Sequence, residues 1–189
     1  MAVSITSRLR RDRAIREAEG YLELLMACAD RWELEPAIRD PLGGRAINLL
    51  MRLDSSDQHS PRVLYLQGLA YREMGRHDEA IIPLQEAADL NPENIQVWLT
   101  LGWCFKRVGR LHAAIEALHE ALAVDPRQAI LHYNLACYWS LAGHAELALE
   151  HLTIALDLGP EYRHMAVDEP DFDSIRMHPG FRELTSVVA

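Results

Sequence analysis

A single spacing of 34 residues recurs through the middle of the chain. Five classes of residue keep it: small residues, loop glycines, two sets of alanines, and prolines. In that order they are Gly68, Gly102 and Ala136; Gly75, Gly109 and Gly143; Ala46, Ala80, Ala114 and Ala148; Ala87, Ala121 and Ala155; and Pro92, Pro126 and Pro160. A fixed period of this length is the signature of a solenoid, in which each unit buries its apolar face only by stacking on its neighbours.

The residues within each period predict a pair of helices. Apolar residues such as Ile81, Leu84 and Leu90 fall at helical spacing. The loop glycines come where the first helix must end, because glycine readily adopts the left-handed conformation that terminates helices. The prolines follow the second helix, which they cannot continue. We therefore expect an all-α chain built from αα-hairpins.

These residues resemble the tetratricopeptide repeat family, whose pattern places bulky, Leu, Gly, Tyr, Ala, Phe, Ala and Pro residues at set offsets. The middle unit resembles the pattern best, with Trp98, Leu101, Gly102, Phe105, Ala114, Leu118, Ala121 and Pro126. The resemblance implies a repeat domain over residues 59–162, with repeats at 61–94, 95–128 and 129–162 wound into a right-handed superhelix. For function it implies binding, usually of a protein segment.

Residues 1–58 are predicted to form an N-terminal helical region with a degenerate repeat. Ala46 keeps the 34-residue register, so the helix around it would be the second helix of that repeat. Asp40 followed by Pro41 predicts the start of this helix, as an N-cap and a first helical proline. Its partner would be a long helix from about Arg8 to Trp32, with apolar residues three and four apart. This long helix could also pack against a second copy of the chain.

Residues 163–189 are predicted to form a C-terminal cap. The segment is acidic and has apolar anchors at Phe172, Ile175, Phe181 and Leu184. It resembles a tail found after the last repeat of many bacterial repeat proteins, with a pattern like DPDFDxLRxxPxF. A solenoid must cover the apolar face of its last unit, which favours the capping role. The alternative is a tail that occupies the binding groove or contacts a partner.

In the family, the first helix of each hairpin lines a concave groove. By position, the resemblance implies nine groove residues here: Tyr65, Leu69, Arg72, Leu99, Trp103, Lys106, Arg107, Tyr133 and Asn134. They combine apolar anchors of the kind that dominates binding energy with three basic side chains in an acidic protein. We therefore expect a peptide or partner segment with apolar and acidic residues. Alternatively, Tyr65 and Tyr133 pack between adjacent helices, and the basic residues are solvated or pair with Glu73 and the acidic tail.

Composition narrows the classes of function. The 189-residue chain has 28 acidic and 19 basic side chains and a formal net charge of -9, which disfavours nucleic acid as a partner. Three cysteines without CxxC spacing favour reduced thiols and a reducing compartment. The longest clean apolar run, Leu24–Ala29, is far too short to span a membrane. An arginine patch at residues 8–16 leaves contact with an anionic membrane or nucleic acid open, without stable insertion.

The chain shows no catalytic motif and no metal-ligand spacing. Two histidine pairs, His112 with His119 and His144 with His151, are seven residues apart, which is too far along a helix for one metal ion. We therefore expect the histidines to be scattered over the surface. The thiols of Cys104 and Cys137 lie on helices that must pack tightly, so they are expected to be small buried groups.

The sequence thus predicts a non-catalytic protein–protein interaction module without a cofactor. Such a module would act as a scaffold, adaptor or chaperone-like binder in a bacterial cytoplasm. Only Asn134 fits the positions with which some family members clamp the C-terminal carboxylate of heat-shock chaperones, so that ligand is not expected. Two alternatives stay open: a secretion-type chaperone for an exported substrate, and an enzyme or metal-binding protein that uses the groove.

Overall fold

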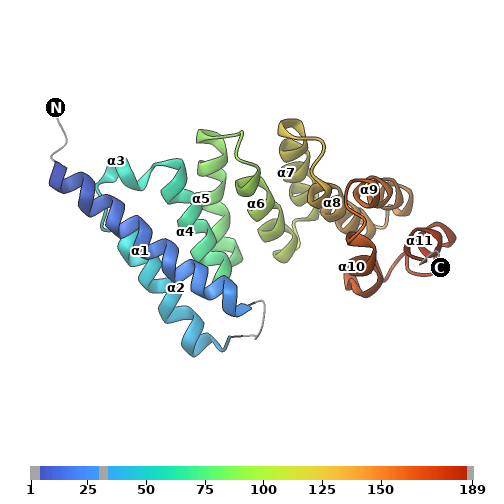
Figure 1. Ribbon diagram of the computed structural model, residues 1–189, viewed down its shortest axis with the longest axis horizontal. Coiled ribbons are helices and arrows are strands. Elements are labelled where there is room, and N and C mark those ends of the chain that lie inside the picture. The colour runs from blue at the N-terminus through green and yellow to red at the C-terminus, as the bar shows by residue number, and fades with distance from the viewer. Residues whose placement is uncertain (1–4, 30–33, 187–189) are drawn as a thin grey trace. The chain divides into compact units, whose positions relative to one another are not determined.

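The computed structural model describes residues 5–29 and 34–186, and all regular secondary structure in these ranges is helical, as expected. The elements are α1 (Ile5–Ala29), α2 (Pro36–Leu50), α3 (Ser55–Gln58), α4 (Pro61–Glu73), α5 (His77–Leu90), α6 (Ile95–Arg107), α7 (Leu111–Val124), α8 (Ala129–Leu141), α9 (Ala145–Leu158), α10 (Tyr162–Asp168), the 3-10 helix η1 (Pro170–Phe172) and α11 (Pro179–Thr185) (Figure 1). They form two compact units, Met1–Cys104 (unit 1) and Phe105–Ala189 (unit 2). The boundary falls inside α6, so it coincides with no predicted repeat boundary, and the repeat boundaries stay predictions.

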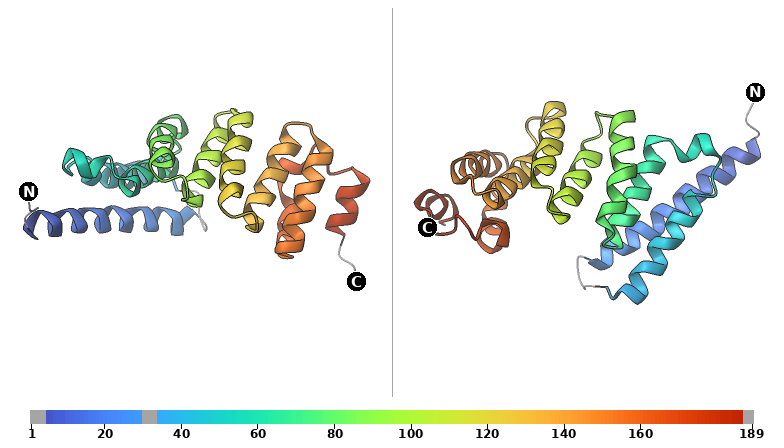
Figure 2. Two further views of the ribbon diagram at one scale, coloured as in Figure 1. Left: turned by 90° about the horizontal axis from the view of Figure 1, so that it is seen from above. Right: turned by 180° about the vertical axis from the view of Figure 1, so that it is seen from behind.

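The paired helices of the repeat lie side by side within each unit. Helix α4 packs against α5 in unit 1, and α8 packs against α9 in unit 2 (Figure 2). The loop glycines have the predicted left-handed conformation, with φ of 74° at Gly75, 77° at Gly109 and 79° at Gly143. A proline lies shortly beyond the end of each second helix, at Pro92, Pro126 and Pro160.

The residues that keep the 34-residue spacing form the core. All seven alanines of the two sets have 0% exposure: Ala46, Ala80, Ala87, Ala114, Ala121, Ala148 and Ala155. The leucines at the equivalent core position are buried as completely: Leu50, Leu84, Leu118 and Leu152. A Cβ added at Gly68 would lie 2.4 Å from Leu84 Cγ, which shows how closely α4 approaches α5. The small-residue positions therefore have the packing role that the sequence predicts.

The N-terminal region of unit 1 differs from its prediction at one helix start. Helix α2 begins at Pro36, the first helical residue, and Pro41 lies inside the helix. The expected start at Asp40 is therefore wrong, because an earlier proline already sets the helical φ at the first position. Helix α1 provides the predicted partner, and the two helices pack together and against α4. Trp32, the predicted end of that partner helix, lies outside the described residues.

A glycine in α2 marks a second close approach. A Cβ added at Gly43 would lie 2.5 Å from Met74 Cγ and 3.5 Å from the Ala70 carbonyl oxygen. The backbone of α2 therefore lies against the end of α4 with no room for a side chain at this position.

The tail after α9 folds as three short helices that pack on the last hairpin. Element η1 contacts α8, while α10 and α11 contact α9. The predicted anchors Phe172, Ile175 and Phe181 are all buried, and Leu184 is half-buried. Among the described residues, no helix is both long and apolar enough to cross a membrane.

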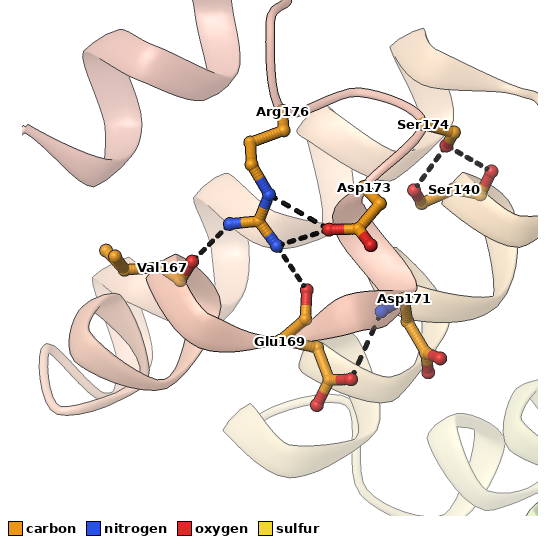
Figure 3. Close-up of polar contacts among 7 residues, drawn as sticks. All are labelled: Ser140, Val167, Glu169, Asp171, Asp173, Ser174 and Arg176. Carbon is orange, nitrogen blue, oxygen red and sulfur yellow. Dashed lines mark hydrogen bonds and ion pairs between the residues drawn. The ribbon is translucent and has the colours of Figure 1, made fainter.

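Hydrogen bonds from Arg176 stabilise the conformation of the turn between η1 and α11. Its guanidinium donates hydrogen bonds to the carbonyl oxygens of Val167 and Glu169, and to the Asp173 carboxylate at 2.6 Å (Figure 3). The Glu169 carboxylate in turn accepts from the backbone N–H of Asp171 at 3.2 Å. The turn is therefore shaped by hydrogen bonds within the tail.

Candidate functional site

The candidate groove residues fall into both units. Tyr65, Leu69, Arg72, Leu99 and Trp103 belong to unit 1, and Lys106, Arg107, Tyr133 and Asn134 belong to unit 2.

In unit 1, Trp103 carries the most prominent exposed apolar surface of the candidates. Its side chain is on α6 and is 37% exposed, and it is the one aromatic among the large exposed hydrophobic residues of the described ranges. The Arg72 guanidinium lies over the indole, with Cζ 5.5 Å from the ring centroid, and His77 meets the ring edge-on at 4.9 Å. Arg72 also forms an ion pair with the neighbouring Glu73. The result is an aromatic platform flanked by a cation that already has one acidic partner.

The other candidates of unit 1 contribute less surface. Leu69 is only 5% exposed and lies in the core that α1, α2 and α4 share. Tyr65 is half-buried against the same core, as the packing alternative proposes. Leu99 is also half-buried. The accessible candidate site of unit 1 therefore centres on Arg72 and Trp103.

In unit 2, the chain's own tail contacts candidates on α8 and at the end of α6. Lys106 forms an ion pair with Asp171 of the tail, and both side chains are mostly buried. The Ser174 hydroxyl donates to the Ser140 carbonyl oxygen at 2.9 Å, and the two serine hydroxyls are 3.0 Å apart (Figure 3). The tail therefore occupies the face of α8 that the groove prediction assigned to a ligand. Asn134 is half-buried and Arg107 is exposed.

Tyr133 lies at the centre of this covered face. Its ring packs against Tyr162 at 5.0 Å and meets Phe172 edge-on at 5.8 Å, and Tyr133 is only 3% exposed. Its hydroxyl is buried and has no hydrogen-bond partner among the described residues. Burial raises the pKa of this phenol, and the negative groups nearby, including Glu169 and Asp171, raise it further. The phenol is therefore neutral and unsatisfied beneath the tail.

Cys104 of unit 1 and Cys137 of unit 2 are buried, and their thiols are unreactive at neutral pH. Burial raises the pKa of the Cys104 thiol to about 12, and burial also raises the pKa of the Cys137 thiol. Because the thiolate is the reactive form, such thiols are poor nucleophiles at neutral pH. Both therefore have the packing role that the sequence predicts.

A histidine contact was missed by the sequence reasoning. His132 is 7% exposed, and its Nδ1 lies 3.1 Å from Nδ1 of His151. His132 Nε2 lies 3.0 Å from the Pro126 carbonyl oxygen, and Trp98 Nε1 donates to the Pro92 carbonyl oxygen at 2.8 Å. His132 lies 34 residues after Trp98, and its ring nitrogen makes the equivalent contact with a proline carbonyl oxygen. The 34-residue register could therefore have predicted that His132 takes the place of this tryptophan. The expectation of scattered surface histidines is wrong for this pair.

The pair predicts a pH-dependent stability of unit 2. The pKa of His151 is lowered from 6.5 to about 4, first by burial and then by His132 and His119. Since the unfolded histidine binds a proton more readily than the folded one, stability is complete above about pH 6.5 and falls as the pH drops towards about 4. We expect a loss of about 1–2 kcal/mol in the free energy of unfolding over this window, because His151 keeps some solvent contact.

Urea unfolding at about pH 7.5 and about pH 4.5 measures this loss. His151→Gln should reduce the loss over this window by about 1–2 kcal/mol, whereas His112→Gln, at a side chain that is 89% exposed, should leave it unchanged. Equal pH dependence in the wild type and His151→Gln would contradict the assignment.

No group of three His, Cys, Asp or Glu side chains in residues 5–29 and 34–186 is placed to hold a metal ion.

Two sequence profiles of the tetratricopeptide repeat match the chain, over residues 71–136 and residues 45–95. Comparison with curated proteins gives no match. Among solved structures, MamA is similar with a TM-score of 0.67 at 18% identity, over 82% of this chain and 90% of MamA. A second MamA structure has a TM-score of 0.59 at 25% identity, over 84% of this chain and 99% of that one. YrrB, described as a TPR protein with an unusual peptide-binding site, has a TM-score of 0.60 at 22% identity, over 66% of this chain and 64% of YrrB.

Proposed function

Because tetratricopeptide repeat profiles match residues 71–136 and 45–95 of the chain, we propose that it is a non-catalytic module that binds a segment of another protein at the surface of unit 1 around Trp103. The observation that carries the proposal is the exposed Trp103 ring beneath the Arg72 guanidinium. Tryptophan and arginine are the residues most enriched at positions that dominate binding energy in protein interfaces. Tyr65 and Leu99 would extend this surface along α4 and α6.

The surface suits a segment that combines an apolar side chain with a carboxylate. The apolar side chain would pack on Trp103, which gains from losing its remaining contact with water. The carboxylate would compete with Glu73 for the Arg72 guanidinium, whose side chain is 27% exposed. YrrB supports a peptide ligand, since it shares this fold and is described as having a peptide-binding site.

The wider role in the proposal is that of a scaffold, adaptor or chaperone-like binder in a reducing compartment such as the bacterial cytoplasm. The three cysteines, all of them free thiols, support such a compartment. Helix α1 exposes Leu9 and Leu24, which supports self-association through this helix as a further part of the proposal.

Trp103→Ala tests the site in unit 1. The matched control is Ile82→Ala, which removes a side chain of unit 1 that is 69% exposed and lies on α5. Both variants and the wild type are immobilised and compared by quantitative mass spectrometry of proteins captured from a lysate of the source organism. We expect Trp103→Ala to reduce the recovery of a specific partner at least about tenfold, and Ile82→Ala to leave it unchanged.

The captured protein is then titrated against each purified variant to give dissociation constants. Circular dichroism confirms that the variants are equally folded before any comparison. Equal affinity of the partner for Trp103→Ala and for the wild type would reject the proposed surface.

A further inference from the structure

The face of α8 in unit 2 is covered by a segment of the same chain. Residues 169–176 contact two groups of this face, Phe172 on Tyr133 and Ser174 on Ser140, and Asp171 pairs with Lys106 near the end of α6. Phe172 is completely buried by this contact and by Phe181. We call this segment the tail turn.

The tail turn has the properties of a preformed peptide ligand. Arg176 fixes its shape through hydrogen bonds to Val167, Glu169 and Asp173, all within the tail (Figure 3). A segment that is already ordered loses little conformational entropy when it binds. The contacts to α8 therefore join two surfaces that are each shaped independently, as at a protein–peptide interface.

The tail turn leaves one polar group of the face unsatisfied. The Tyr133 hydroxyl is buried beneath it without a hydrogen-bond partner among the described residues. A buried hydroxyl without a partner is costly, because it loses its hydrogen bonds to water and gains none. A competing segment that offers an acceptor or donor to this hydroxyl would therefore gain an interaction that the tail turn does not make.

We infer that the α8 face, together with Lys106 of α6, is a second peptide site, held closed by the tail turn, and that it takes a partner segment in which an acidic residue directly precedes an aromatic one. Such a segment would repeat the contacts of Asp171 with Lys106 and of Phe172 with Tyr133, and would displace the tail turn. The inference rests on the proposed function of partner binding, but it concerns a different unit and a different surface. The tail turn then regulates access, because a partner binds only in competition with an intramolecular ligand.

The probe for this site is a fluorescently labelled synthetic peptide with the sequence of residues 167–178, which includes the Val167 carbonyl that Arg176 binds, and the protein is the full chain. In the variant Asp171→Lys, the tail turn of the protein is repelled by Lys106, because like charges at this distance oppose docking. We expect the peptide to bind Asp171→Lys at least about tenfold more tightly than it binds the wild type, whose site is occupied. Fluorescence anisotropy measures both affinities.

Two matched controls show whether the peptide uses the proposed contacts. A peptide with Phe172→Ala should not bind measurably to Asp171→Lys. A protein with Lys106→Asp should prefer a peptide with Asp171→Lys over the unchanged peptide, since the charge pair is then restored with reversed signs. Tyr133→Phe combined with Asp171→Lys should bind the unchanged peptide as well as Asp171→Lys does, because the tail turn does not use the hydroxyl.

Absence of peptide binding to a folded Asp171→Lys variant would overturn the inference, as would equal binding to the wild type.

Hydrogen exchange of the wild type gives a second test that requires no variant. The amides of residues 172–178 should exchange at least about tenfold faster than those in the middle of α8, because the tail turn can open while the hairpin stays folded. Equal exchange rates would mean that the tail is an inseparable part of the core and would also overturn the inference. Neither test involves Trp103, so their failure is distinguishable from failure of the proposed function.

Discussion

Phe172→Ala is expected to destabilise unit 2 by about 3–5 kcal/mol, the range for removing a fully buried phenylalanine side chain. The ring is completely buried and makes aromatic contacts with Tyr133 at 5.8 Å and Phe181 at 5.3 Å. Element η1 has three residues and therefore little stability of its own. Truncating its one large apolar side chain should release the tail and expose the apolar surface of α8.

Urea unfolding measures the total loss, and hydrogen exchange assigns it to unit 2. The matched control is Met177→Ala, which removes a long apolar side chain of the same tail that is 72% exposed. We expect the control to change the free energy of unfolding by less than about 0.5 kcal/mol. A similar small effect of both variants would show that the tail does not contribute to stability through its aromatic anchor.

The fold of the hairpins could be predicted in detail because each signal in the sequence has a local physical cause. Gly75 and its equivalents terminate helices through a conformation that other residues avoid, and the structure confirms this. Ala46 and Leu50 stay in register with the later repeats and are fully buried, as the register predicts, while their assignment to a degenerate repeat stays a prediction. The start of α2 was not predictable, because Pro36 and Pro41 are both acceptable first residues of a helix.

The candidate site was less predictable because it depends on contacts between residues far apart in the sequence. The resemblance placed Lys106 and Tyr133 among the groove residues, but it did not pair them with residues 171 and 172 of the tail. The sequence left two roles open for the tail, covering the last hairpin or occupying the groove. In the structure η1 packs on α8 and α11 packs on α9, so the tail contacts the surfaces that both roles require.

Leu84→Ala should destabilise unit 1 by about 2–5 kcal/mol, since Leu84 has 0% exposure and its removal leaves a cavity between α4 and α5. The small residue facing it makes a sharper experiment possible. A Cβ added at Gly68 would lie 2.4 Å from Leu84 Cγ and 2.7 Å from Leu84 Cδ2, so Gly68→Ala should itself cost about 1–3 kcal/mol through overpacking. Neither variant alone shows that the two residues oppose each other.

The double variant Gly68→Ala, Leu84→Ala shows this directly. In it the added methyl group enters space that the missing leucine leaves, so the combined loss should be smaller than the sum of the single losses by about 1 kcal/mol or more. Gly20→Ala is the matched control for the alanine substitution, because a Cβ at this position in α1 meets nothing within 4 Å and should stabilise the helix by up to about 1 kcal/mol. Urea unfolding of the four proteins gives the coupling energy. Strictly additive losses would mean that the cost of Gly68→Ala does not arise from contact with Leu84, and that the packing of α4 on Leu84 does not require a small residue at position 68.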